Sequence, residues 1–176
     1  MKKPDLSAIY AQLEPTVNAN NMELYNLEML TEYGNKILRV YIDNLDTTQP
    51  VTLDDCERIN NAIMPVLDAD DPIAGAYVLE VSSPGIERKL VKESHYQRYI
   101  GRLVELKLTK PISTKPTQPT QPTEQAAEPE KSKKFVGKLI GLDGGLITIS
   151  TETAEIAIQR DIIAQCRLVY TERETL

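Results

Sequence analysis

The sequence has few of the residues on which catalytic and metal sites are commonly built. It contains one histidine, His95, and two cysteines, Cys56 and Cys166, which lie far apart and form no CxxC pair. Zinc sites need closely spaced cysteine and histidine ligands, and disulfide frameworks need several cysteines. The sequence therefore predicts no metal, no cofactor, no disulfide and no enzymatic activity. A reducing cytoplasm is the location expected for such a chain.

Aromatic residues and long apolar runs are also scarce. Tryptophan is absent, and Phe135 is the single phenylalanine. Modules that read RNA sequence stack bases on aromatic side chains, so this scarcity argues against such a module. No apolar run approaches the ~20 residues of a membrane-spanning helix. Pro4 and Asp5 stand where the apolar run of a signal peptide would begin, which predicts no export signal.

Charge is distributed unevenly along the chain, whose net charge is −6. Residues 1–80 hold 5 basic and 14 acidic side chains, whereas residues 81–109 hold 6 basic and 3 acidic ones. A protein that bound nucleic acid over its whole surface would be basic throughout. The acidic part instead suits a basic protein partner, and RNA contact is then confined to the basic seam, residues 81–109. The simpler alternative is that the low pI only keeps the protein soluble.

Periodicity in the first 90 residues predicts a small α/β domain. Apolar residues three and four apart indicate a helix from Leu6, ended by Asn20-Asn21 and kinked or broken near Glu14 by Pro15. A hairpin is expected over residues 22–43, and a second helix is expected to begin after Thr52. A strand at residues 77–81 then lies parallel to its predecessor, so the order is α-β-β-α-β.

The second half of the chain predicts a small all-β domain. Five short runs alternate between apolar and polar residues; they are Leu103–Leu108, Phe135–Ile140, Leu146–Ser150, Ala154–Ile158 and Ala164–Val169. Five such strands with tight turns suggest an SH3-like or Sm-like barrel. The Pro/Thr/Gln-rich residues 110–133 lack apolar side chains and are expected to form a disordered loop. The fold class is thus α+β, with a domain at 1–90 and a barrel at 91–176.

The most informative stretch is Tyr77–Leu90, YVLEVSSPGIERKL, in which a half-buried strand runs into a tight turn. Pro84 and Gly85 are typical corners of a type II turn, because the second corner needs a positive φ. The serine hydroxyls, the amides around Gly85 and the guanidinium of Arg88 suit an anion such as phosphate or carboxylate. The alternative is that the turn is only a strand exit and a hinge between the domains.

This stretch resembles the signature of the RimP family of bacterial ribosome maturation factors. Other passages agree in order and spacing: YIDN from Tyr41, TLDDCERIN from Thr52, LDADDPI from Leu67, HYQRYIG from His95 and GKLIGLDGGLITI from Gly137. The signature residues carried over by the resemblance, as interdomain or partner contacts, are Ser82, Ser83, Pro84, Gly85 and Arg88.

The resemblance implies a non-catalytic assembly factor that binds the immature small (30S) ribosomal subunit. Its partners would be ribosomal RNA and a basic ribosomal protein near the decoding region, and we expect a cytoplasmic monomer that does not bind membranes. Candidate contacts to ribosomal RNA in the basic seam are Lys89, Lys92, Arg98, Arg102 and Lys107. A general RNA-binding module or RNA chaperone with an Sm-like barrel remains the alternative, and the seam is equally consistent with a solvated surface.

Overall fold

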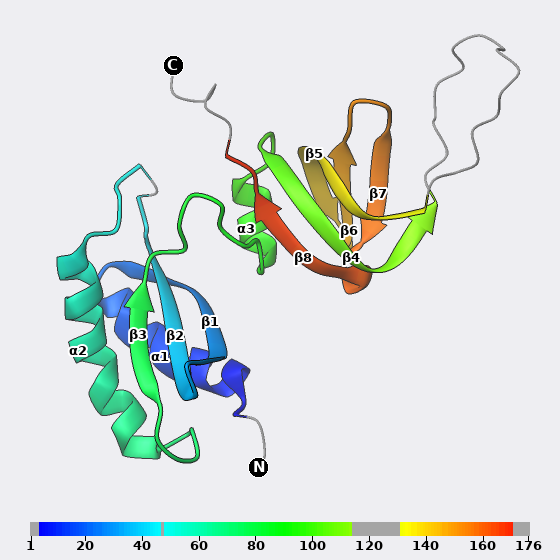
Figure 1. Ribbon diagram of the computed structural model, residues 1–176. Helices are drawn as coiled ribbons and strands as arrows, with labels where there is room; N and C mark the ends of the chain where they lie inside the picture. Colours follow the sequence, from blue (N-terminus) through cyan, green and yellow to red (C-terminus); the bar gives the residue numbers. More distant parts are fainter. Residues whose placement is uncertain (1–3, 47, 114–130, 171–176) are drawn as a thin grey trace, which may run out of the picture. The chain divides into compact units, whose positions relative to one another are not determined.

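The computed structural model describes residues 4–46, 48–113 and 131–170, shown in Figure 1. Within these ranges the protein is a mixed α+β structure with two sheets and three α-helices. The chain divides into two compact units, Met1–Pro84 and Gly85–Leu176, and each has its own apolar core. None of the helices in the described ranges is long and apolar enough to cross a membrane.

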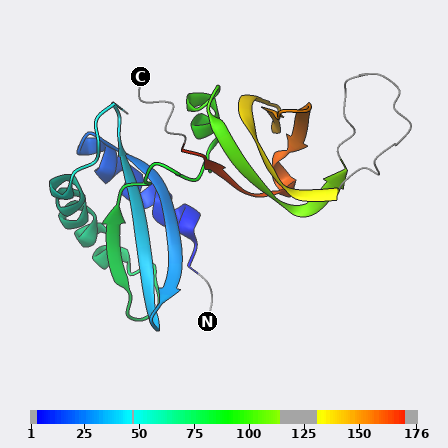
Figure 2. The same cartoon turned by 45° about the horizontal axis from the view of Figure 1, so that its top comes forward.

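The first unit has the expected α-β-β-α-β order. Its elements are α1 (Leu6–Ala19), β1 (Met22–Glu32), β2 (Asn35–Asn44), α2 (Leu53–Asp70) and β3 (Val78–Ser82). In the sheet, β2 lies in the centre, antiparallel to β1 and parallel to β3. Both helices cover one face of this sheet (Figure 2) and pack their apolar stripes on it. The unit is therefore a two-layer sandwich whose other sheet face is not covered by α1 or α2.

Local signals explain where the elements of the first unit begin and end. The β1–β2 hairpin turns at Tyr33 and Gly34, which both have positive φ, as a two-residue type I′ turn requires. Asn20 caps α1, and Asn21 follows in the left-handed conformation. Thr52 caps α2 as predicted.

Two expectations for the helices were wrong. The helix α1 continues through Pro15 without a break, because Leu13 and Val17 on either side are fully buried and hold both segments against the sheet. Leu53 was expected in the buried stripe of α2, yet it is 86% exposed. It is the first residue of that helix and lies before the turn that contacts the core.

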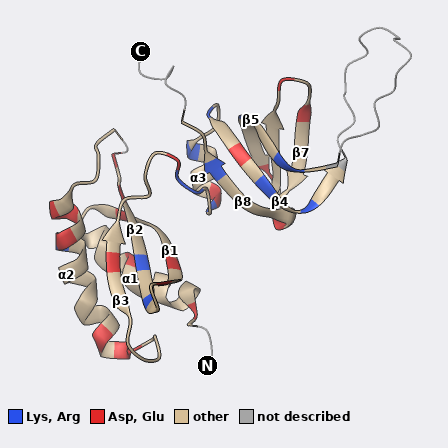
Figure 3. Cartoon of the chain, in the orientation of Figure 1, with Lys and Arg blue, Asp and Glu red and all other residues tan. Residues whose placement is uncertain are grey.

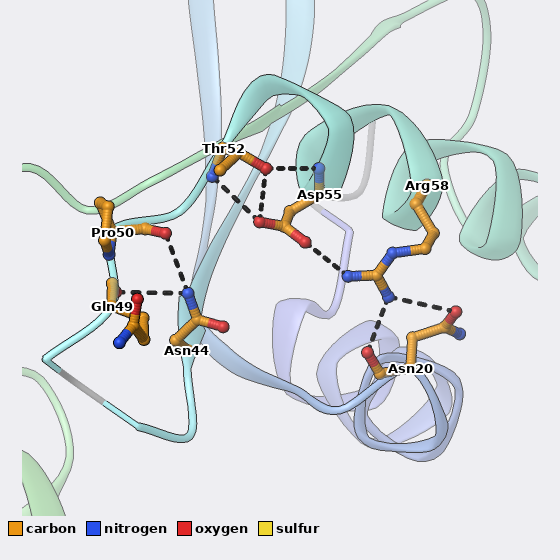
Figure 4. A network of polar contacts seen from close by, with 7 residues as sticks. All are labelled: Asn20, Asn44, Gln49, Pro50, Thr52, Asp55 and Arg58. Carbon is orange, nitrogen blue, oxygen red and sulfur yellow. Dashed lines mark hydrogen bonds and ion pairs between the residues drawn. The ribbon is translucent and has the colours of Figure 1, made fainter.

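The start of α2 is fixed by a polar network (Figure 4). The Thr52 hydroxyl accepts the Asp55 amide at 3.2 Å, and the Asp55 carboxylate accepts the Thr52 amide at 3.0 Å. Arg58 donates to that carboxylate at 2.6 Å and to the Asn20 carbonyl, at the end of α1, at 2.7 Å. Hydrogen bonds from Thr52 and then Arg58 lower the pKa of Asp55 to about 2. The network thus ties the start of one helix to the end of the other.

Replacing Asp55 with Asn is expected to destabilise the protein by about 1 kcal/mol at neutral pH, the usual magnitude for a lost N-terminal cap. Because the pKa of Asp55 is lower in the folded than in the unfolded state, its contribution is present above pH ~4 and is lost as the pH falls toward 2. Thermal melts of both proteins across this range should converge at the acid end. Asp54→Asn, in the same helical turn, is the control, and an equal pH dependence there would contradict the assignment.

The second unit is built on a five-stranded antiparallel sheet. Its elements are α3 (Glu93–Arg98), β4 (Leu103–Ser113), β5 (Lys131–Asp143), β6 (Leu146–Ser150), β7 (Glu155–Gln159), the 3₁₀ helix η1 (Arg160–Ile162) and β8 (Ile163–Leu168). All five expected strands are present. The strand order is β7-β6-β5-β4-β8, so the last strand returns to lie beside the first one of this sheet.

The connection between β7 and β8 shows that this sheet is strongly curled. These strands lie at opposite edges of the sheet, four spacings or roughly 19 Å apart if it were flat. Only η1 joins Gln159 to Ile163, and a chain of that length reaches at most ~14 Å. The edges must therefore approach each other. Within the described strands no pairing joins β7 to β8, so hydrogen bonds do not close the sheet into the expected barrel.

The expected disordered loop begins later and ends earlier than predicted. Residues 110–113 belong to β4 and residues 131–133 to β5, where Ile112 pairs with Ser132 and Ser113 with Lys131. Composition did not reveal this, because ladder pairing uses backbone groups and does not require apolar side chains at a hairpin end. The rest of the predicted loop, residues 114–130, lies outside the described residues.

The Ser113–Lys131 pair allows a direct test of the insertion. Replacing residues 114–130 with Asn-Gly should join two directly paired residues by a favoured hairpin turn. The replaced segment, TKPTQPTQPTEQAAEPE, has only two alanines as apolar residues. We therefore expect the free energy of unfolding to change by less than ~1 kcal/mol, measured by chemical denaturation. A larger loss would mean that the segment contributes to the packing.

Candidate functional site

The signature turn lies at the junction of the two units. Ser82 is the last residue of β3, and the division between units falls between Pro84 and Gly85. Gly85 has φ +74°, as predicted, and no atom lies within 4 Å of the position of a Cβ there. Glycine is therefore required by backbone conformation and not by space. The turn itself is at Ile86–Glu87, two residues later than expected. The Ser82 hydroxyl donates to the Ser83 carbonyl at 3.0 Å.

Arg88 connects this turn to α3. Its Nε donates to the Gly85 carbonyl at 2.9 Å, and its Nη1 donates to the Tyr99 hydroxyl at 2.9 Å. Its guanidinium carbon also lies 5.9 Å from the centre of the Tyr99 ring. Tyr99 is the C-cap residue of α3. The geometry therefore gives Arg88 a bracing role inside the second unit.

The residues after the turn extend the second sheet. The Leu90 amide donates to the Cys166 carbonyl at 2.9 Å, and the Leu168 amide donates to the Arg88 carbonyl at 3.0 Å. Lys89 pairs with Arg167 in an antiparallel bridge. Residues 88–90 therefore lie along the edge of β8 that β4 does not occupy. These backbone pairs place residues 85–90 with the second unit, whereas the sequence had assigned them to the first.

The five candidate RNA contacts are split between two places. Lys89 and Lys107 lie on or beside the strands, where each is paired across to a neighbouring strand. Lys92 is the N-cap of α3 and Arg98 is its last residue, while the Arg102 carbonyl accepts the Leu139 amide just before β4. The fold thus does not gather all five into one site.

Three further basic residues were missed by the sequence analysis: Lys134, Lys138 and Arg167. They come from β5 and β8, outside the basic seam, and only strand pairing brings them near Lys89 and Lys107. The period-two alternation from Lys134 to Lys138 carried a local signal that these lysines share one face.

The lone histidine and the two cysteines have structural surroundings. His95 is fully buried, and its Nδ1 accepts the amides of Val91 and Lys92 at 3.2 and 3.4 Å. It therefore packs within the second unit, whereas an interdomain position had been expected. Burial raises the pKa of the Cys166 thiol to about 12, so this group is protonated at neutral pH. Cys56 is half-buried against the first core. Among the described residues, no group of three or more His, Cys, Asp or Glu side chains is arranged to hold a metal ion.

Residues 12–87 match the family model of the RimP N-terminal domain. The chain belongs to the RimP family. The match begins within α1 and ends two residues after Gly85, so it spans most of the first unit and the signature turn. The RimP resemblance drawn from the sequence is thereby confirmed, and RimP is a family of ribosome maturation factors.

Proposed function

We propose that this RimP protein binds the immature small ribosomal subunit and promotes its maturation without catalysing a reaction. The observation that carries the proposal is the RimP N-terminal domain at residues 12–87. The partners that we infer are ribosomal RNA and a basic ribosomal protein near the decoding region. The protein acts as a monomer in the cytoplasm, where ribosomes are assembled.

The charge of the first unit supports a basic protein partner. Acidic side chains follow α2 (Figure 3), and those exposed to solvent are Asp54, Glu57, Asp68, Asp70 and Asp71. A surface of one sign attracts a partner of the other sign and speeds the encounter, and salt weakens this attraction. Affinity for the basic ribosomal protein should therefore fall as ionic strength rises.

The curled sheet supports an SH3-like or Sm-like barrel for the second unit. Five antiparallel strands, a three-residue link between the two edge strands and a last strand returned to the first are features of a small, nearly closed barrel. Such barrels leave their outer faces for binding. We place the RNA contacts of the protein on this unit, together with the signature residues Ser82, Ser83, Pro84, Gly85 and Arg88 at its entry.

A general RNA-binding module or RNA chaperone is the second candidate, favoured by the basic residues on β4, β5 and β8 (Figure 3). The two functions differ in what they require. A module of this kind binds naked RNA of many origins and has no effect on ribosome assembly when it is lost.

Loss of the gene tests the maturation role. An assembly factor leaves precursor small subunits and unprocessed small-subunit RNA when it is removed, whereas large subunits mature normally. Reintroducing the wild-type gene should restore the ratio of mature small to large subunits. Equal amounts of mature small subunits with and without the gene would exclude the proposal.

A further inference from the structure

Strand pairing in the second unit assigns alternate residues to opposite faces of the sheet. Val104, Leu106 and Leu108 of β4 are buried in the second core, as are Phe135 of β5 and Cys166 of β8. Because side chains alternate along a strand, the residues between these positions lie on the outer face. That outer face of β8, β4 and β5 is what we call the outer sheet face.

The charged residues of the outer sheet face stand in cross-strand rows. Lys89 is opposite Arg167, which is in turn opposite Glu105. In the next row Lys107 is opposite Lys134. Lys138 lies on the far side of the Glu105 row, opposite Leu103. Basic side chains thus surround a single carboxylate, and they come from three segments that are distant in sequence.

Glu105 offsets only part of this positive charge. Its carboxylate lies 2.6 Å from Lys134 Nζ and 3.7 Å from Lys107 Nζ, and the Lys134 hydrogen bond lowers its pKa. Both lysine side chains remain more than half exposed, at 60% and 53%. Like charges directly opposite each other in a sheet are destabilising, so the Lys107–Lys134 and Lys89–Arg167 pairs are unfavourable for folding alone. An external anion would offset this repulsion.

The spacing of these groups suits a polyanion. Neighbouring side chains are ~5 Å apart across strands and ~7 Å apart along them, which is within the Debye length of ~8–10 Å. The groups therefore act on a bound chain together. Among the described residues of these three strands, the outward positions between the basic ones hold Val136, Ile140 and Gln165, and none is aromatic. The face has no platform on which bases could stack.

We propose that the outer sheet face binds the sugar-phosphate backbone of RNA, without reading its sequence. The inference rests on the proposed function, in which RNA of the small subunit is the available polyanion. Lys107, Lys134, Lys138 and Arg167 contact phosphates, and Lys89 extends this surface at the edge of β8. Phosphate contacts of this kind position a protein on RNA and release counterions.

The test compares two double variants of the full chain. Lys107→Gln with Lys138→Gln removes two charges from the outer sheet face, and Lys36→Gln with Lys133→Gln removes two exposed charges elsewhere. The probes are a transcript of small-subunit ribosomal RNA and an unrelated RNA of equal length, titrated over a range of salt concentrations. The face variant should bind both RNAs ~10-fold or more weakly, with the slope of log K against log salt reduced by ~1.5. Its melting temperature should stay equal or rise slightly.

Three results would overturn the inference. One is an affinity of the face variant equal to that of the wild type, and another is an equal loss in the control, which would show dependence on total charge. The third is loss of binding to precursor subunits with RNA affinity unchanged, which would assign the face to an acidic protein. The proposed function fails separately, if the wild-type protein itself does not associate with small-subunit precursors.

Discussion

Gly137→Ala should destabilise the second unit by about 1–3 kcal/mol, the range for forcing atoms into a packed site. Gly137 lies on β5, where the curl of the sheet brings β6 very close. A Cβ at this position would lie 2.6 Å from the Ser150 carbonyl oxygen and 3.3 Å from Thr151 Cγ2. The nearest obstacle is backbone, which cannot move aside as a flexible side chain can. Thermal and urea denaturation of the two proteins measure the loss.

Gly141 supplies a matched control on the same strand. No atom lies within 4 Å of the position of its Cβ, so Gly141→Ala should change stability by no more than ~0.5 kcal/mol. Equal effects at both positions would show that β6 does not approach Gly137 closely, and the tight curl described for this sheet would be wrong.

Arg88→Ala should lower the stability of the second unit by about 2 kcal/mol, within the range for hydrogen bonds to a charged group. The substitution removes the links from the guanidinium to the Gly85 carbonyl and to the Tyr99 hydroxyl. For a domain of this size the melting temperature should fall by ~8–16 °C. The transition of the second unit, followed by calorimetry, is the appropriate measurement.

A double-mutant cycle with Tyr99→Phe separates bracing from partner contact. If the Arg88–Tyr99 hydrogen bond stabilises the fold, the two substitutions are non-additive by at least ~0.5 kcal/mol. If Arg88 instead serves mainly as a partner contact, Arg88→Ala leaves the melting temperature unchanged and weakens only association with the ribosomal subunit. That outcome would contradict the bracing role.

Elements with local signals could be predicted from the sequence. Thr52 and Asp55 mark the start of α2 because a capping box involves residues only three apart. Alternation identified β3, whose residues Leu79 and Val81 pack on the first core as expected. The positive φ of Gly85 followed from its place after Pro84. In each case the physical cause lies within a few residues of its effect.

Features set by distant contacts could not be predicted. Burial on both sides of Pro15 keeps α1 continuous, and no residue near the proline reveals this. The pairing of residues 88–90 with β8 joins segments almost 80 positions apart, and it changes the unit to which the signature exit belongs. For the same reason Arg167 was not seen as a neighbour of Lys89. A cross-strand register depends on the whole sheet, whereas periodicity describes one strand at a time.

Sedimentation with ribosomal particles tests the central claim, that this RimP protein recognises an immature small subunit. Purified protein is mixed in separate gradients with precursor small subunits, mature small subunits and large subunits at equal concentrations and near-physiological salt. We predict that it comigrates with the precursor particles, much less with mature small subunits and not with large subunits. Equal comigration with all three particles, or with none, would contradict the account.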